Sequence, residues 1–193
     1  MSIFLEIGPG RGDFLFWLAE QNPTDTVIAV EYKRKRFEKL KMRIEKRGLK
    51  NVWLYLGDAR KVLPQEFNDS CFDKIYILFS DPWPKRRHAT HRLFQQDFVE
   101  QIYRILIPGG RIFIAHDDTD YLIEIKDLFR QNAVRFISNG AWDAQTMTFY
   151  AEKWLKEGRP LEFFYYRKID TSTRNDLSLP CVDSTFKNYR DLP

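Results

Sequence analysis

The run from Asp81 to His88 places a carboxylate, an aromatic ring and several cations within a few consecutive positions. The apolar segment 75–79 before it is typical of a central strand. Neither Pro82 nor Pro84 can continue that strand, because proline has no amide donor and a fixed φ. Asp81 is therefore predicted at the carboxyl end of the strand, the edge where open α/β sheets bind ligands. Cations crowded in a loop repel one another unless an anion meets them, so the run predicts a reaction site on a nucleic acid.

A glycine-rich segment, Glu6-Ile7-Gly8-Pro9-Gly10-Arg11-Gly12, joins the first predicted strand to the first predicted helix. Glycines at positions 8, 10 and 12 let the backbone approach a ligand where a Cβ would collide. A dinucleotide fingerprint needs its third glycine one position later, where this chain has Asp13. That negative charge would face a pyrophosphate at the helix N-terminus, so a phosphate-bearing cofactor is disfavoured.

Three carboxylates fall where an adenosine ligand with a positive centre would need them. Glu31 ends the second predicted strand, about 20 residues past the glycines, where a carboxylate can bind both ribose hydroxyls. Asp58, followed by Ala59 after the third strand, can accept from an adenine amino group, and Glu6 can reach an amino-acid or sulfonium group. Each alone could be a helix cap or an exposed carboxylate; together they favour S-adenosylmethionine as cofactor.

Apolar periodicity predicts the elements that position these residues. Strands are expected at 3–7, 27–30, 52–56, 75–79, 111–115, 134–137 and 161–167. Helices are expected from Asp13, over 37–44 with an end near Gly48, over 94–105 up to Pro108-Gly109-Gly110, and over 121–129. Strands that alternate with helices predict a doubly wound, mostly parallel α/β sheet. One domain is expected over residues 1–169, with a surface-packed or partly mobile tail at 170–193.

Composition narrows the class of protein. The chain has 193 residues, 44% of them hydrophobic, and an apolar run long enough for a membrane helix or a secretion signal is missing, so we expect a cytoplasmic protein without membrane contact. Cys71 and Cys181 form no C-x-x-C pair and the three histidines no ligand cluster, which disfavours a metal site. Basic residues crowd between Lys33 and Lys50, which could be no more than a solvated helix face. Monomer and homodimer both remain open.

Three segments together resemble the bacterial tRNA (guanine-N7)-methyltransferase family: the glycine loop 6–12, the run from Phe79 to His88, and Met147-Thr148-Phe149-Tyr150. The resemblance spans about residues 3–168. The glycine loop is shared by many methyltransferases, whereas Asp81-Pro82-Trp83-Pro84-Lys85 followed by Arg87-His88 is close to specific for this family.

The resemblance implies a Rossmann-like class I methyltransferase fold of seven strands, the last one antiparallel. It also implies methyl transfer from S-adenosylmethionine to N7 of guanine 46 in the variable region of tRNA. By position it implies cofactor contacts at Glu6, Glu31, Asp58 and Asp81, with Asp81 also the catalytic residue. The positions implied to contact tRNA are Lys85, Arg87, His88, Asp117, Thr148, Tyr150, Ala151 and Glu152.

Two motifs depart from the family pattern. Family members usually read R-H-x-K-R-R where this chain reads Arg87-His88-Ala89-Thr90-His91-Arg92, which removes two cations from the RNA side. The late motif often reads T-x-x-E, and here the fourth position is Ala151 with Glu152 beside it. Either of these two residues could fill the late-motif role.

Chemistry assigns Asp81 a role without proton abstraction. Guanine N7 carries a lone pair and no hydrogen, so a carboxylate would stabilise developing positive charge and orient the base. Trp83 could stack on an extruded base or only brace the turn, and Asp117 could bind guanine N1 and N2 or cap a helix. The alternative function is a catalytically weak, methyltransferase-like RNA-binding subunit. A methyltransferase of an exocyclic amine is disfavoured, since its motif usually places Asn or Asp before Pro-Pro and an aromatic residue.

Overall fold

A computed structural model of the chain describes residues 1–142 and 148–170, apart from the side chains of Arg86, Phe149 and Tyr150. The predicted tail lies outside the described residues from position 171 onward, so the domain boundary after 169 stays a prediction. Among the described helices, none combines the length and the apolar character that a membrane-spanning helix requires.

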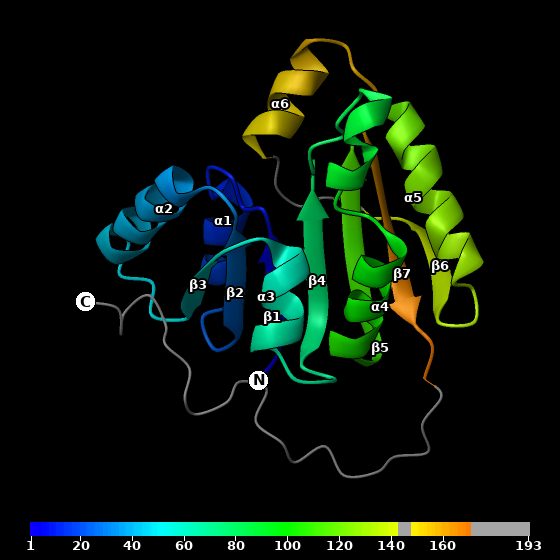
Figure 1. Cartoon of the computed structure of the whole chain (residues 1–193). Coiled ribbons are helices and arrows are strands. Elements are labelled where there is room, and N and C mark those ends of the chain that lie inside the picture. Colours follow the sequence, from blue (N-terminus) through cyan, green and yellow to red (C-terminus); the bar gives the residue numbers. More distant parts are fainter. Residues whose placement is uncertain (143–147, 171–193) are drawn as a thin grey trace.

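Strands and helices alternate along the described chain (Figure 1). The strands are β1 Ile3–Ile7, β2 Thr26–Glu31, β3 Val52–Leu56, β4 Phe72–Leu78, β5 Leu106–His116, β6 Phe136–Ala141 and β7 Glu162–Lys168. The helices are α1 Asp13–Gln21, α2 Arg34–Lys46, α3 Ala59–Glu66, the 3-10 helix η1 Arg86–His91, α4 Gln96–Ile105, α5 Thr119–Gln131 and α6 Phe149–Lys156.

The strands form one sheet in the order β3-β2-β1-β4-β5-β7-β6. Pairs β1–β2, β1–β4, β2–β3 and β4–β5 are parallel, whereas β7 runs antiparallel to both β5 and β6. The strand order reverses between β1 and β4, which is the switch point where such sheets open a crevice for ligands. The predicted doubly wound, seven-stranded fold with an antiparallel last strand is confirmed.

Both faces of the sheet are covered by helices, because side chains alternate between the two sides of each strand. Leu5 and Ile7 of β1 belong to the hydrophobic cluster that also holds the buried residues of α3, α4 and α5. Phe4, on the opposite side of the same strand, belongs to the cluster built with α1 and α2. This alternation explains why the central strands read as continuous apolar runs.

The structure differs from the sequence-based expectation at several boundaries. Helix α4 begins at Gln96, so Phe94 lies before it, and the Pro108-Gly109-Gly110 segment lies within β5 rather than only ending a helix. It fits there because the register between β4 and β5 shifts after the Phe72–Leu106 pair, so proline and glycine interrupt no regular ladder. The sixth strand begins at Phe136 and not at Val134. Helices α3, η1 and α6 were not predicted.

Candidate functional site

Four acidic side chains come from the ends of four neighbouring strands. Glu6 lies in β1, Glu31 ends β2, and Asp58 and Asp81 follow β3 and β4. Two adjoining pockets meet at this edge, one of about 370 Å³ that includes Glu6 in its lining and one of about 480 Å³ that includes Glu31 and Asp58. Asp81 lines both of them. The structure therefore gathers the carboxylates predicted from the sequence into one cleft.

The glycine loop turns sharply between β1 and α1. Gly8 and Gly12 have φ of 73° and 82°, in the left-handed region that glycine adopts without strain. A Cβ at position 8 would meet no atom within 4 Å, so the backbone there borders open space. Glu31 is buried and holds the loop in place, because its carboxylate accepts hydrogen bonds from the amides of Gly10 at 3.3 Å and Lys33 at 2.8 Å.

Glu6 is almost completely buried, at 2% exposure, and one of its carboxylate oxygens has no hydrogen-bond partner among the described residues. Burial, with the nearby charges of Asp13 and Glu31, raises the pKa of Glu6 to about 8. A buried carboxyl group without a partner is unfavourable unless a ligand supplies a donor or a positive charge. Glu6 therefore marks the place in the cleft where a cationic group would bind.

Asp58 caps α3 and is paired with Arg60. Its carboxylate accepts from the Arg60 amide at 3.0 Å and from the Arg60 guanidinium Nη2 at 2.6 Å. This hydrogen bonding lowers the pKa of Asp58 below its usual value. Arg60 Nη1 also donates to the Thr90 carbonyl at 3.2 Å, which links this side of the cleft to η1.

Asp81 lies in a strained turn after β4. Its Oδ1 accepts from the Trp83 amide at 3.2 Å, and both Phe79 and Trp83 have positive φ, at 56° and 44°. Non-glycine residues rarely adopt that conformation, which costs about 1 to 2 kcal/mol per residue. Such a turn persists only because its surroundings hold it, and it aims an exposed carboxylate into the cleft.

Trp83 packs against η1 and lines the larger pocket. Its ring meets the rings of His88 and His91 at centroid distances of 5.6 and 5.1 Å. Arg92 donates to the carbonyls of Pro82 and Trp83 at 2.8 and 3.3 Å and pairs with Glu124. The ring of Trp83 thus braces the loop, and the Arg92 cation is engaged within the protein rather than directed outward.

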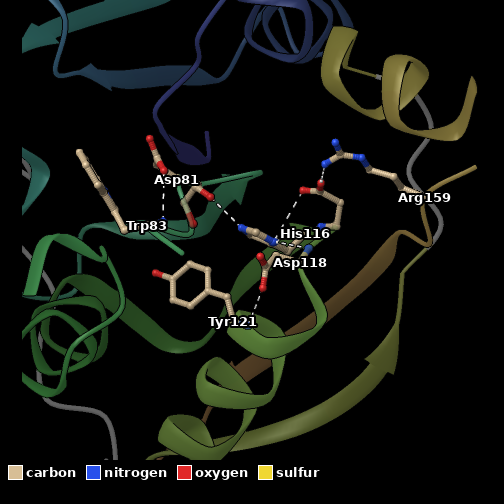
Figure 2. Close-up of polar contacts among 8 residues, drawn as sticks. Asp81, Trp83, His116, Asp118, Tyr121 and Arg159 are labelled. Atoms are coloured by element: carbon tan, nitrogen blue, oxygen red, sulfur yellow. Dashed lines mark hydrogen bonds and ion pairs between the residues drawn. The ribbon is translucent and has the colours of Figure 1, made fainter. Parts of the chain in front are cut away.

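His116 joins the loops that carry Asp81 and Asp117 (Figure 2). The ring is 1% exposed, its Nδ1 lies 3.0 and 2.9 Å from the amides of Asp117 and Asp118, and its Nε2 lies 2.7 Å from the Ser80 carbonyl. Because Nδ1 accepts from two amides, the proton of the neutral ring belongs on Nε2, which donates to Ser80. Burial lowers the pKa of His116 and keeps the ring neutral.

Asp117 faces the smaller pocket and does not cap a helix. The N-cap of α5 is Asp118, which accepts from the Tyr121 amide at 2.8 Å. Asp117 instead pairs with Arg159 at 2.9 Å (Figure 2). The Arg159 guanidinium lies over the Trp154 ring, 4.0 Å from its centre. The capping alternative for Asp117 is therefore wrong, and its carboxylate is available at the pocket wall.

The late motif begins helix α6. Thr148 is its N-cap, accepts from the Ala151 amide at 3.1 Å, and lines the smaller pocket. Ala151 is buried and Glu152 is exposed, and neither is among the residues that line the two pockets. The side chain of Tyr150 lies outside the described part, so its contact with tRNA stays a prediction.

Lys85, Arg87 and His88 lie outside the cleft itself, on the rim formed by η1. Lys85 and Arg87 are exposed, and His88 is half-buried against Trp83. The structure thus separates the predicted residues into a cleft set and a rim set. Within residues 1–142 and 148–170, no group of three or more His, Cys, Asp or Glu residues has a metal-binding arrangement.

Sequence reasoning missed several residues of the cleft. Arg159 and Trp154 line the smaller pocket, and Lys33 and Arg36 line both pockets. The two basic residues follow Glu31 directly, so their position after β2 could have indicated them. No spacing signal distinguishes Trp154 or Arg159, because they reach the pocket through the path of α6 over the sheet edge (Figure 1).

Comparison with known proteins agrees with this reading. A family model described as "Putative methyltransferase" matches residues 1–163. A tRNA (guanine-N(7)-)-methyltransferase from Thermotoga maritima is 33% identical over 89% of this chain and 56% of its own length. One from Geobacter metallireducens is 32% identical over 85% of this chain and 81% of its own length.

Solved structures support the same fold. A SAM dependent methyltransferase from Aquifex aeolicus superposes with a TM-score of 0.60 at 16% identity, over 87% of this chain and 82% of that one. An rRNA methylase from Streptococcus thermophilus gives a TM-score of 0.57 at 17% identity, over 87% of each chain.

The sheet order and the solved structures show the class I methyltransferase fold, and the matching family model identifies the chain as a member of a methyltransferase family. Within that class, the chain belongs to the tRNA (guanine-N7)-methyltransferase family. It spans little more than half the length of several relatives, including 56% of the Thermotoga maritima protein and 59% of one from Nitrosomonas europaea.

Proposed function

We propose that this protein transfers a methyl group from S-adenosylmethionine to N7 of a guanine in tRNA, at position 46 of the variable region. The observation that carries the proposal is the convergence of Glu6, Glu31, Asp58 and Asp81 from four adjacent strands on one cleft. Family membership supplies the reaction class. Because tRNA is the acceptor, we place the reaction in the cytoplasm.

The charged residues of the cleft suit S-adenosylmethionine. Glu6, with its unpartnered oxygen, is matched to the cationic methionine end. We assign Glu31 to the ribose hydroxyls. Asp58 is assigned to the adenine, with its carboxylate shared between the ligand and Arg60. Gly8 lets a ligand approach the backbone closely. When bound, the cofactor supplies an electrophilic methyl group on a sulfonium.

Asp81 is the proposed catalytic residue. The N7 lone pair attacks without loss of a proton, so the carboxylate is not needed as a base. It stabilises the positive charge that develops on the guanine ring. The strained turn fixes Asp81 between the two pockets, where it can orient the base beside the donor. Positioning of this kind can contribute about 7 to 11 kcal/mol to a bimolecular transfer.

Substrate contacts are assigned to the opposite wall and the rim. Asp117 and Thr148 line the smaller pocket and are proposed to hold the guanine edge. Lys85, Arg87 and His88 on η1 are proposed to contact the RNA around the target nucleotide. The Asp117 carboxylate must exchange its pairing with Arg159 for the base, or share it.

The test is direct methylation of unmodified tRNA with labelled S-adenosylmethionine, followed by reductive cleavage at 7-methylguanosine. We expect cleavage at position 46 with the wild-type protein. The Asp81→Ala variant should stay folded and bind S-adenosylhomocysteine, the cofactor product. Its kcat/KM should be lower than that of the wild type by about 100-fold or more. Cofactor binding without any cleavage signal in the wild-type protein would instead support the RNA-binding-subunit alternative.

A further inference from the structure

Helix α2 and its flanks carry a charge opposite in sign to the rest of the molecule. Residues 33–50 contain ten Lys or Arg and two Glu, a net charge of +8, whereas the whole chain carries +4. The remainder of the chain is therefore net −4. A helix that only needs to stay solvated is served by interspersed charges of both signs, so this excess indicates an anionic partner.

Three of the four lysines of α2 form one stripe on its outer face. Phe37, Leu40 and Ile44 are buried against the sheet. Lys35, Lys39 and Lys46, spaced by whole helical turns, project from the opposite side and are all exposed. At 1.5 Å per residue the stripe is about 16 Å long, enough to follow several consecutive phosphates.

Two arginines at the C-terminal end of α2, Arg43 and the C-cap Arg47, are engaged within the protein. The guanidinium groups of Arg43 and Arg47 lie 4.5 and 4.7 Å from the ring centre of Phe16 in α1, and Arg47 also pairs with Glu20. The amino groups of Lys35, Lys39 and Lys46, in contrast, form no ion pair or hydrogen bond with the described residues. The lysine stripe is thus the part of α2 that can meet a ligand without breaking internal contacts.

The stripe begins beside the cleft. Lys33 and Arg36, at the start of α2, line both pockets with Asp81. Figure 1 shows α2 and α6 at the same end of the sheet, on either side of the strand ends that carry the site. An RNA strand whose guanine enters the cleft can therefore continue along α2.

The other basic rim is thin in this chain. Thr90 and His91 stand where the family pattern has two cations, and Arg92 is bound to Glu124 and to two carbonyls. Phosphate contacts supply most of the affinity of proteins for nucleic acids. Lys85 and Arg87 at η1 are exposed, but the two substituted positions and the engaged Arg92 leave fewer cations there for phosphates, and α2 provides a further basic surface.

We propose that Lys35, Lys39 and Lys46 of α2 bind backbone phosphates of the tRNA beside the target nucleotide. The inference rests on the proposed function, since it assigns a binding surface to the same substrate. The contacts are sequence-independent, because lysine meets phosphate as a point charge.

The test is a triple variant, Lys35→Gln, Lys39→Gln and Lys46→Gln, in which glutamine preserves helix propensity. We expect the tRNA Kd at about 100 mM salt to rise about tenfold or more, and the slope of log Kd against log salt to fall by about 2 to 3. Affinity for S-adenosylhomocysteine, measured by calorimetry, should stay unchanged and shows that the variant is folded.

The matched control is Lys61→Gln, Arg111→Gln and Arg130→Gln, which removes the same charge from exposed positions on α3, β5 and α5. An equal loss of tRNA affinity in the control would show that net charge alone explains the effect, and would overturn the inference. An unchanged slope of log Kd against log salt in the α2 variant would also overturn the inference, even if α2 then proved to bind anionic lipid vesicles. Cleavage at 7-methylguanosine in the wild-type protein tests the proposed function separately.

Discussion

Glu6 is the residue whose ionisation is most altered by the fold. Its pKa rises from an ordinary 4.5 to about 8. Between those values the unfolded chain has lost the proton while the folded protein retains it, so the folded state loses stability as pH rises. A bound cation would reverse this effect by favouring the carboxylate.

Glu6→Gln should therefore stabilise the ligand-free protein more at pH 8 than at pH 6. The difference in unfolding free energy between variant and wild type should grow by about 2 kcal/mol over that interval, since each unit of pH contributes about 1.4 kcal/mol. Urea denaturation at both pH values measures it. A difference independent of pH would mean that Glu6 is already ionised in the free protein.

The same carboxyl group predicts a proton released on cofactor binding. Calorimetric titration with S-adenosylhomocysteine at pH 7, in two buffers with different ionisation enthalpies, should report release of up to about one proton by the wild type and less by Glu6→Gln. The readout does not depend on catalysis. Equal proton release by both proteins would assign the proton to another group.

His116 should stabilise the loops that hold Asp81 and Asp117 through three hydrogen bonds. His116→Phe keeps a ring beside Tyr121 but removes the partner of two partly buried amides and one carbonyl, at a cost of about 2 to 4 kcal/mol. His116→Asn retains an acceptor for the amides and should cost less. Urea denaturation at pH 7.5 compares the three proteins, and a phenylalanine variant as stable as wild type would contradict the bonding.

The contribution of His116 should also depend on pH. The ring faces the carboxylates of Asp81, Asp117 and Asp118, yet burial dominates and lowers its pKa. Stability from the neutral ring is thus fully present above about pH 6.5 and is lost as pH falls below that value. The stability difference between wild type and His116→Phe should shrink over that range, because Nδ1 cannot accept once it is protonated.

At the scale of elements, helix α6 depends on one residue beyond its end. Arg159 joins Trp154 of α6 to Asp117 at the end of β5. Arg159→Ala should therefore raise the rate of amide hydrogen exchange in α6 by about five- to tenfold, because such a pair stabilises the helix by about 1 kcal/mol. Exchange in β4 and β5 should not change.

Arg130→Ala is the control for this helix, because Arg130 also pairs with an aspartate, Asp127, but on α5. Its removal should leave exchange in α6 at the wild-type rate. Faster α6 exchange in both variants, or in neither, would show that the Arg159 contact does not hold the helix.

The elements were predictable where one period dominates the pattern. Strands β1 to β4 are buried on both faces and read as apolar runs, and α2 shows its buried positions at helical spacing. Helix α3 was not predicted although Asp58 caps it, because it has only 8 residues and Pro64 lies inside it. The pairing of Asp58 with Arg60 is a local contact at the helix start, whereas that of Asp117 with Arg159 joins residues 42 positions apart, which no sequence pattern predicts.

At the scale of the whole molecule, the glycine loop lies between the cleft and the layer formed by α1 and α2 on one face of the sheet. Gly12 lies where α1 approaches α2, and a Cβ there would meet Leu40 Cδ2 at 2.5 Å and Phe16 at 2.8 Å. Both neighbours belong to the core on that face of the sheet. Gly8 has a similar positive φ, but a Cβ there would meet nothing within 4 Å. Gly12 is thus needed for packing of the core, whereas Gly8 is needed for the approach of the ligand.

Gly12→Ala should destabilise the whole protein by about 2 to 5 kcal/mol, the sum of left-handed backbone strain and overpacking. Gly8→Ala should cost only the strain, about 1 to 2 kcal/mol, yet lower the affinity for S-adenosylhomocysteine by about tenfold or more, because its methyl group would project into the cleft. Urea denaturation and calorimetry on both variants give the comparison. Equal destabilisation by the two alanines would show that the core yields around position 12, and unchanged binding by Gly8→Ala would move the ligand away from the loop.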